Sequence, residues 1–307
     1  MKDIRKILVV IDPASEEQPA FDAALTIAAA CGAHLALFAC EFRDAHIRYH
    51  PVELTVAQQF HDLIVANLGR RLEELAGRAR EKGVESDGAV VWAAPLYEEI
   101  TTKAREIQPD LVVKATRYHS RIRRTLLTGA DWHLIRDCPA PLLLVKRTQW
   151  PANPLIVAAV DPLHAHDKPA ALDRQLLDTA QLLASTLHGR VEALHVYAMP
   201  GPFEVIGDVA AAATSAAATS AVPSVEDVRK SLASLLEPYR IPPAAQHLRV
   251  GRPAEGIIGF AEEREAQFVI MGALSRSRLE RLFIGNTAEA VLDQLPCNVL
   301  VEKPVHS

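Results

Sequence analysis

Cysteine is scarce in this sequence, and its placement argues against structural roles for it. The 307 residues include four cysteines, Cys31, Cys40, Cys138 and Cys297, and none of them forms a Cys-x-x-Cys pair. A disulfide framework or a zinc site would need paired or closely spaced cysteines. We therefore expect reduced thiols, as is usual for proteins of the cytosol.

Long hydrophobic runs are absent as well. The longest apolar stretches, such as residues 154–160, have the length of a β-strand. A membrane-spanning helix needs roughly 20 apolar residues. Residues 1–12 also lack the longer apolar core and the small-residue cleavage site of a signal peptide. The sequence therefore predicts neither a membrane span nor a leader.

The sequence has no excess of positive charge. Lys and Arg number 33 against 38 Asp and Glu, which gives a formal net charge of -5. Such a chain has no global basic field that would attract nucleic acid or an anionic membrane. The hydrophobic share of 49% and the charged share of 23% are those of a globular protein. The length suggests two domains.

The chain contains an internal repeat. Four landmarks recur in the same order at nearly constant spacing, which chance similarity of apolar runs seldom produces. The matching segments are 6–13 with 154–162, 34–38 with 190–196, 111–115 with 268–272, and 137–146 with 295–303. Pro151 and Pro154 mark a break between the copies. We therefore divide the chain into domain 1, residues 1–150, and domain 2, residues 151–307.

Each half alternates strand-like runs with alanine-rich amphipathic segments. The strand-like runs lack polar alternation, which is typical of a parallel sheet covered by helices on both faces. Helical spacing recurs among apolar residues in both halves. These residues are Leu68, Leu72, Leu75 and Ala79 in the first half and Leu172, Leu176, Leu177, Ala180, Leu183 and Ala184 in the second. With right-handed crossovers, the pattern predicts an α/β fold with a five-stranded parallel open sheet in each half.

The best candidate for a ligand site lies in the second half. Ligands of open parallel sheets bind at the carboxyl ends of the strands, where the strand order reverses. A strand there ends in Gly272, and Gly285 precedes a predicted helix that starts near Asn286 and Thr287. Glycine at the strand end allows a ligand to approach the backbone closely. Free N–H groups at a helix start can face an anion such as phosphate.

The spacing of this segment carries a family resemblance. Gly272, Ser275 and Gly285, followed by Asn286 and Thr287, resemble the Gly-x2-Gly-x9-Gly-(Ser/Thr) loop of the universal stress protein family. Together with residues 128–139 and 282–289, they make the whole chain similar to the tandem, E-type form with two UspA-type domains. The resemblance implies Rossmann-like domains of the adenine nucleotide alpha hydrolase-like type. It also implies a cytoplasmic, non-catalytic stress-response protein, and some members of the family bind ATP.

The resemblance places the candidate ligand residues in domain 2. They are Val160, Asp161, Met271, Gly272, Ser275, Gly285, Asn286 and Thr287. ATP or another adenine nucleotide is the candidate ligand, and no metal is expected. Domain 1 departs from the loop pattern, because its segment 115–121 has no glycine at either matching position and Tyr118 would fill the space. We expect domain 1 not to bind ATP in the way that is usual for the family.

The same residues also have structural interpretations. Asn286 and Glu289 fit an N-cap and a capping box, and Asp12 and Asp161 precede proline in predicted turns. The loop arginines can clamp phosphate or form a solvated face. These are Arg117, Arg121, Arg123, Arg124, Arg276, Arg278 and Arg281. The histidine pairs His46 with His50 and His164 with His166 each lack an evident third metal ligand.

Several functions remain open at this stage. The leading one is a ligand sensor or scaffold without turnover. The alternatives are a nucleotide hydrolase or adenylyl-transferring enzyme, an apolar-ligand binder lined by residues 200–206 and 210–222, and a pure interaction module. In the last, the final strands 142–146 and 298–302 pair within the chain, and a homodimer is a further possible partner. The alanine-rich insert 210–221 fits either a loop or a helical lid.

Overall fold

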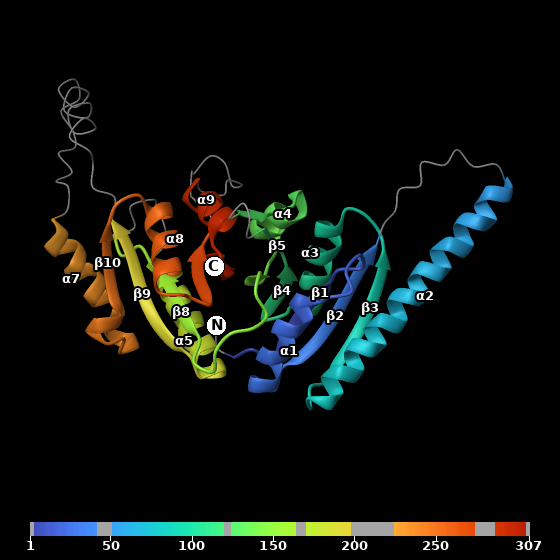
Figure 1. Ribbon diagram of the computed structural model, residues 1–307, viewed down its shortest axis with the longest axis horizontal. Coiled ribbons are helices and arrows are strands. Elements are labelled where there is room, and N and C mark those ends of the chain that lie inside the picture. The colour runs from blue at the N-terminus through green and yellow to red at the C-terminus, as the bar shows by residue number, and fades with distance from the viewer. Residues whose placement is uncertain are drawn as a thin grey trace, which may run out of the picture.

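Two halves of the chain share one ten-stranded sheet (Figure 1). The computed structural model describes residues 3–41, 51–119, 124–163, 170–197, 224–273 and 286–304. The strand order is β10-β9-β8-β11-β12-β7-β4-β1-β2-β3. The alanine-rich insert and the apolar segments 200–206 and 210–222 lie outside the described residues.

The two halves follow the same element order. The first contains β1 (Lys6–Ile11), α1 (Pro19–Cys31), β2 (His34–Glu41), α2 (Pro51–Glu81), β3 (Ser86–Trp92), α3 (Leu96–Ile107), β4 (Leu111–Ala115), β5 (Arg117–His119), β6 (Arg124–Leu126), α4 (Gly129–Asp137) and β7 (Leu142–Val145). The second contains β8 (Leu155–Ala159), α5 (Ala170–Leu187), β9 (Arg190–Tyr197), α7 (Val225–Leu236), β10 (Gln246–Val250), α8 (Pro253–Glu263), β11 (Phe268–Gly272), α9 (Asn286–Gln294) and β12 (Asn298–Glu302).

Each half has the predicted parallel topology. Five strands of the first half run β3-β2-β1-β4-β7, and those of the second run β10-β9-β8-β11-β12, all parallel within the half. Strand order therefore reverses beside β1 and beside β8, as in a doubly wound sheet. The α/β fold class predicted from the repeat is confirmed.

Apolar side chains explain why the strands are central. β8 is buried along its whole length, and so are Ile7–Ile11 of β1, because helices cover both faces of the sheet. The leucines and alanines predicted to form the inner faces of two helices are all buried. They lie on α2 and α5. The helical periodicity was therefore a correct guide to the core.

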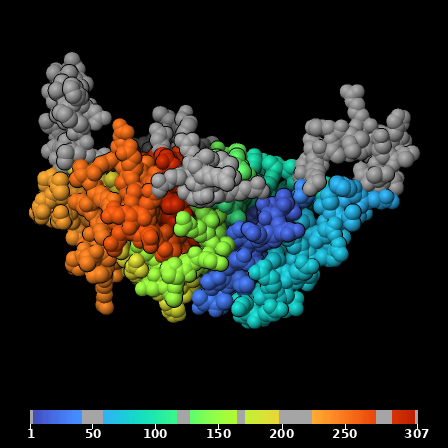
Figure 2. All heavy atoms as spheres, in the orientation of Figure 1, coloured from blue at the N-terminus to red at the C-terminus, as the bar shows by residue number. Residues whose placement is uncertain are grey.

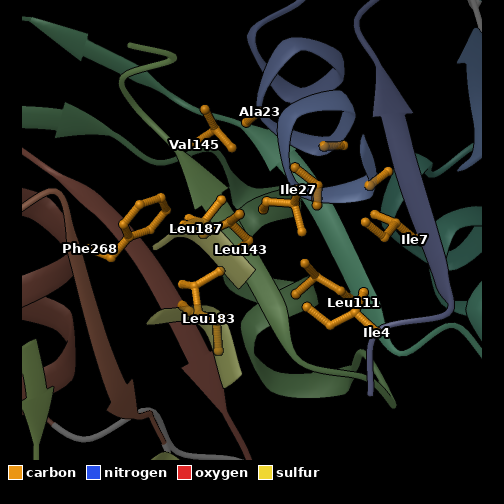
Figure 3. Close-up of a cluster of buried hydrophobic side chains, with 14 of the residues drawn as sticks. Ile4, Ile7, Ala23, Ile27, Leu111, Leu143, Val145, Leu183, Leu187 and Phe268 are labelled. Atoms are coloured by element: carbon orange, nitrogen blue, oxygen red, sulfur yellow. The ribbon is translucent and has the colours of Figure 1, made fainter. Parts of the chain in front are cut away.

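The halves meet through an antiparallel strand pair. β12 pairs with β7, and Leu300 lies opposite Leu143. The pairing relates the halves by a local two-fold and places α1 beside α5. Figure 3 shows Leu143 of the first half packed among Ile27, Leu183 and Leu187. In the space-filling view, the orange and red second half lies to one side and the blue and cyan first half to the other (Figure 2).

One element differs from the sequence prediction. The degenerate segment after β4 was expected to be a loop, but β5 and β6 pair in it as an antiparallel two-stranded sheet. β6 lies against α9 of the second half. The first-half counterpart of the glycine loop therefore contacts the other half of the chain.

Helix lengths bear on membrane contact. α2 is the longest helix, with 31 residues, and extends outward beside β3 (Figure 1). Among the described residues, no helix combines the length and apolar character needed to cross a bilayer.

The antiparallel pair of β7 and β12, which we call the seam, joins the halves into one sheet and predicts one cooperative unfolding transition. Leu143→Ala should lower the free energy of unfolding by about 3 kcal/mol, because the side chain is fully buried at the joint between the halves. Urea denaturation followed by circular dichroism measures this. Val250→Ala, at a half-exposed position of the edge strand β10, should change it by less than about 0.5 kcal/mol. Separate transitions for the two halves would contradict the prediction.

Candidate functional site

The carboxyl ends of β8 and β11 lie side by side at the place where the sequence predicts a ligand site. β8 lies beside β11, and Ala158 is registered with Ile270. Continuing that register brings Val160 opposite Gly272 and Asp161 to the same edge. Val160 and Met271 are buried, and Asp161 is half-buried. Four of the eight candidate residues therefore come together where the strand order reverses.

The turn after the first strand of each half is fixed in the same way. The Asp161 backbone N–H donates to Asp173 Oδ1 of α5 over 3.0 Å. The Asp12 N–H donates to Gln18 Oε1 over 3.0 Å. Asp12 Oδ1 also accepts from Ala14 N over 2.9 Å, which is the geometry of a turn-forming aspartate. The structural interpretation of Asp12 is therefore supported.

The remaining candidate residues are only partly described. Ser275 and Gly285 lie outside the described residues, as do the loop arginines 276, 278 and 281 and the histidines 46, 50, 164 and 166. α9 begins at Asn286, with Thr287 half-buried in its first turn. Asn286 is therefore inside the helix, one position later than the N-cap role predicted from the sequence. Such one-residue shifts are common at helix ends.

Metal binding gains no support from geometry. Among the residues that the structure describes, no group of three His, Cys, Asp or Glu side chains is placed to hold a metal ion. His133, on α4, stacks on Tyr97 with ring centroids 3.9 Å apart.

The local two-fold allows a position-by-position comparison of the halves. Leu143 and Leu300 occupy the same place at the seam, so Val145 corresponds to Glu302. Strand registers then match Ala115 with Gly272 and place Lys114 where the second half has Met271. The two halves share their backbone plan but differ in polarity at these positions.

In the first half an internal ion pair occupies the start of α4. Lys114 Nζ lies 2.7 Å from Asp131 Oδ1, with side chains only 13% and 1% exposed. Asp131 Oδ2 accepts from the Thr128 N–H over 2.7 Å and from Thr128 Oγ1 over 2.8 Å. The chain's own carboxylate thus satisfies the positive end of this helix. An external anion would have to displace it.

The second half has apolar residues at the same two positions. The last turns of α4 and α9 end in equivalent hydrogen bonds, from Cys138 N–H to Leu134 O and from Leu295 N–H to Val291 O. When the two helices are aligned on these bonds, Asp131 corresponds to Ala288. Ala288 and Met271 are both buried. The first turn of α9 therefore has no carboxylate in the place that Asp131 fills.

A second polar pair lies on the opposite face of the sheet, in the second half. Glu302 is 1% exposed, and Thr179 Oγ1 donates to its Oε1 over 2.5 Å. Gln175 Nε2 donates to Glu302 Oε2 and, over 3.0 Å, to Lys303 O. Burial raises the pKa of the Glu302 carboxyl above its ordinary value, although the two side-chain hydrogen bonds oppose this.

The first half has an apolar pair in that place. Helices α1 and α5 end in equivalent hydrogen bonds, from Ala33 N–H to Ala28 O and from Gly189 N–H to Ala184 O. When the two helices are aligned on these bonds, Ala23 corresponds to Thr179. Figure 3 shows Ala23 beside Val145. Sequence reasoning did not single out Glu302 or Thr179. The sequence did contain one signal: Glu302 ends the last strand of the second half, whereas the matching strand of the first half ends in Val145.

A buried histidine lies near the carboxyl end of β9, next to the ends of β8 and β11; we call these three strand ends the polar edge of the second half. His195, on β9, is 4% exposed, and its Nδ1 lies 3.0 Å from Val160 O. Because a carbonyl only accepts, Nδ1 is the donor. No described residue supplies a hydrogen bond to Nε2. The equivalent first-half residue, opposite Ile11, is Ala39.

Comparison with known proteins decides the family. The model described as "Universal stress protein family" matches residues 3–146 and 156–303. The chain belongs to the universal stress protein family. The resemblance to its tandem form is confirmed, with one match in each half.

Relatives in the family match along nearly the whole chain. Universal stress protein E of Salmonella typhi is 29% identical over 310 residues, covering 98% of this chain and 94% of the relative. The protein of that name from Escherichia coli K12 is 28% identical with the same coverage. A putative universal stress protein from Pseudomonas aeruginosa UCBPP-PA14 superposes with a TM-score of 0.72 at 24% identity, covering 98% and 93% of the two chains. One from Archaeoglobus fulgidus gives 0.67 at 15%, covering 97% and 96%. These structures share the fold.

The Glu302 pair predicts a non-additive mutant cycle. Thr179→Ala alone should cost about 2 kcal/mol of unfolding free energy, since it removes a hydrogen bond from a buried carboxyl. Thr179→Ala with Glu302→Val recreates the Ala23–Val145 pair and should lie within about 1 kcal/mol of the natural protein. Urea titrations of Thr179→Ala, of Glu302→Val and of the double variant measure this. Additive losses would contradict it.

The same variants should differ in pH dependence. A carboxyl whose folded pKa is raised is more protonated in the folded state, so its contribution to stability falls as pH rises above the ordinary Glu pKa. The double variant should lack this fall.

The first-half ion pair predicts the mirror-image result. Asp131→Ala should cost about 3 kcal/mol, because it leaves the Lys114 ammonium largely buried without its carboxylate. Adding Lys114→Met recreates Met271 and Ala288 and should recover at least half of that loss. Thermal unfolding at matched pH provides the measurement. A double variant less stable than Asp131→Ala would show that the ammonium is not the source of the cost.

Proposed function

We propose that this protein senses an adenine nucleotide through its second half and does not turn it over. The observation that carries the proposal is the contrast between the two helix starts. α4 is filled by the Lys114–Asp131 pair, whereas α9 has Ala288 and Met271 in those positions. An anion at the start of α9 would therefore meet no carboxylate in the place of Asp131, and Glu289 of the same turn is exposed to solvent.

Glycine at the end of β11 supports the same half. Gly272 stands opposite Glu302 in the neighbouring strand and corresponds to Ala115 of the first half. Without a Cβ, its backbone can approach a ribose or phosphate closely.

The polar edge has the span of a nucleotide. His195 on β9 and Gly272 on β11 are separated by one strand, hence by about 10 Å at the usual strand spacing. The α9 end would receive phosphate, and the base would lie toward β9. The candidate residues Val160 and Asp161 lie between them.

A sensing or scaffold role fits the hydrogen bonds that the nearby acidic side chains make within the protein. Asp173 holds the Asp161 amide, and Glu302 accepts from Thr179 and Gln175. A general base needs a lone pair directed at substrate. These carboxylates are engaged inside the fold, so we favour binding over hydrolysis. The family resemblance adds a cytoplasmic location to the proposal.

Calorimetric titration with ATP tests the site with a matched pair of variants. Gly272→Val should weaken ATP binding at least tenfold, since its side chain would enter the space over the strand end. Ala115→Val, at the equivalent first-half position, should leave the affinity within twofold. Equal losses in both variants would argue against a site in the second half. A natural protein that binds neither ATP, adenosine nor inorganic phosphate would overturn the proposal.

A phosphate-release assay separates sensing from hydrolysis. The sensor should leave ATP intact over hours. Release that disappears in Gly272→Val would favour the nucleotide hydrolase instead.

A further inference from the structure

Each half ends its last strand with a lysine that crosses the seam. Lys146, after β7, donates from Nζ to Leu292 O and Leu295 O, both over 2.9 Å, at the C-terminal end of α9. Lys303, after β12, donates to Arg136 O over 3.4 Å and to Cys138 O at the end of α4. The two contacts are related by the local two-fold. Each half therefore caps a helix of the other.

The chemistry of these contacts is that of a helix C-cap. The last carbonyls of a helix have no partner within it and carry partial negative charge. An ammonium there satisfies two acceptors and interacts favourably with the dipole. Burial of Lys146 lowers its pKa to about 8, while Asp293 and Cys297 act in the opposite direction. Burial therefore disfavours the charged form of Lys146, and the two carbonyl oxygens at the end of α9 stabilise it.

Two further contacts attach α9 and the last strand of the second half to the first half. β6, in the hairpin that replaces the glycine loop, lies against α9. Asn298 Oδ1 accepts from the backbone N–H groups of Lys146 and Arg147, each over 2.9 Å. The first half therefore holds α9 at its C-terminal end and along its side.

We propose that Lys146 is a positioning residue for the ligand site of the second half. The inference rests on the proposed function, because α9 runs from that site at Asn286 and Thr287 to the Lys146 contact. Its nine residues span about 13 Å. A fixed C-terminal end sets where the first-turn N–H groups point. The first half, although it holds no nucleotide itself, thereby sets the affinity of the second.

The two-fold supplies a matched control. Lys146→Met removes the cap of α9, and Lys303→Met removes the equivalent cap of α4, where Lys114 and Asp131 fill the helix start. In ATP titrations, Lys146→Met should raise the Kd about five- to tenfold, through lost alignment and lost positive charge. Lys303→Met should change it less than twofold, while both lower the melting temperature. Lys146→Arg should recover most of the affinity.

The outcomes distinguish this inference from the function beneath it. If the natural protein binds no ATP, the proposed function fails and this inference fails with it. If it binds ATP and the two methionine variants have equal affinities, only the inference is overturned.

Hydrogen exchange of the natural protein tests the coupling without a variant. ATP should slow exchange in α9, in residues 142–147 and in the β5–β6 hairpin, and should leave β2 and β3 unchanged. Protection confined to the second half would overturn the inference.

Discussion

The antiparallel pairing of β7 with β12 is the constraint on which the rest of the structure depends. Each half alone would end in a short, buried strand with unpaired backbone groups along one edge. Pairing places both strands in the interior of one sheet. It also brings α1 against α5 and sends Lys146 and Lys303 across to the opposite helices. Two copies that only shared a linker would have none of these contacts.

The two halves differ in their buried polar pairs and share the same strand order. The first half keeps a buried pair at Lys114 and Asp131, where the second has apolar residues. The second keeps Glu302 with Thr179, where the first has Val145 and Ala23. A buried polar group costs most when one partner is missing, so each pair changes as a unit. The exchanges lie on opposite faces of the sheet, and the backbone tolerates either version.

Sequence periodicity was sufficient for the fold and insufficient for the site. Unbroken apolar runs and the four repeated landmarks predicted the strands, because burial on both faces leaves no other pattern. The β5–β6 hairpin was missed because its short strands carry no such run. Glu302 was missed because its partners come from α5, 123 residues away in the case of Thr179. Lys114 was missed for the same reason, whereas the spacing of Thr128 and Asp131 is the local signal of a capping box and could have pointed to Asp131. A long-range contact between single side chains leaves no local signal.

The arrangement restricts how one half can influence the other. The first half has an internal ion pair at the start of α4, so it can act on the second half only through the contacts beside the β7–β12 pair. These contacts lie on both faces of the sheet. On one face α1 packs against α5, which supplies Asp173 to the Asp161 amide. On the other, Lys146 and β6 contact α9, which carries Thr287. Both routes end near the carboxyl ends of β8 and β11. The first half is therefore mechanically connected to the helices and strands that bear the proposed ligand site of the second.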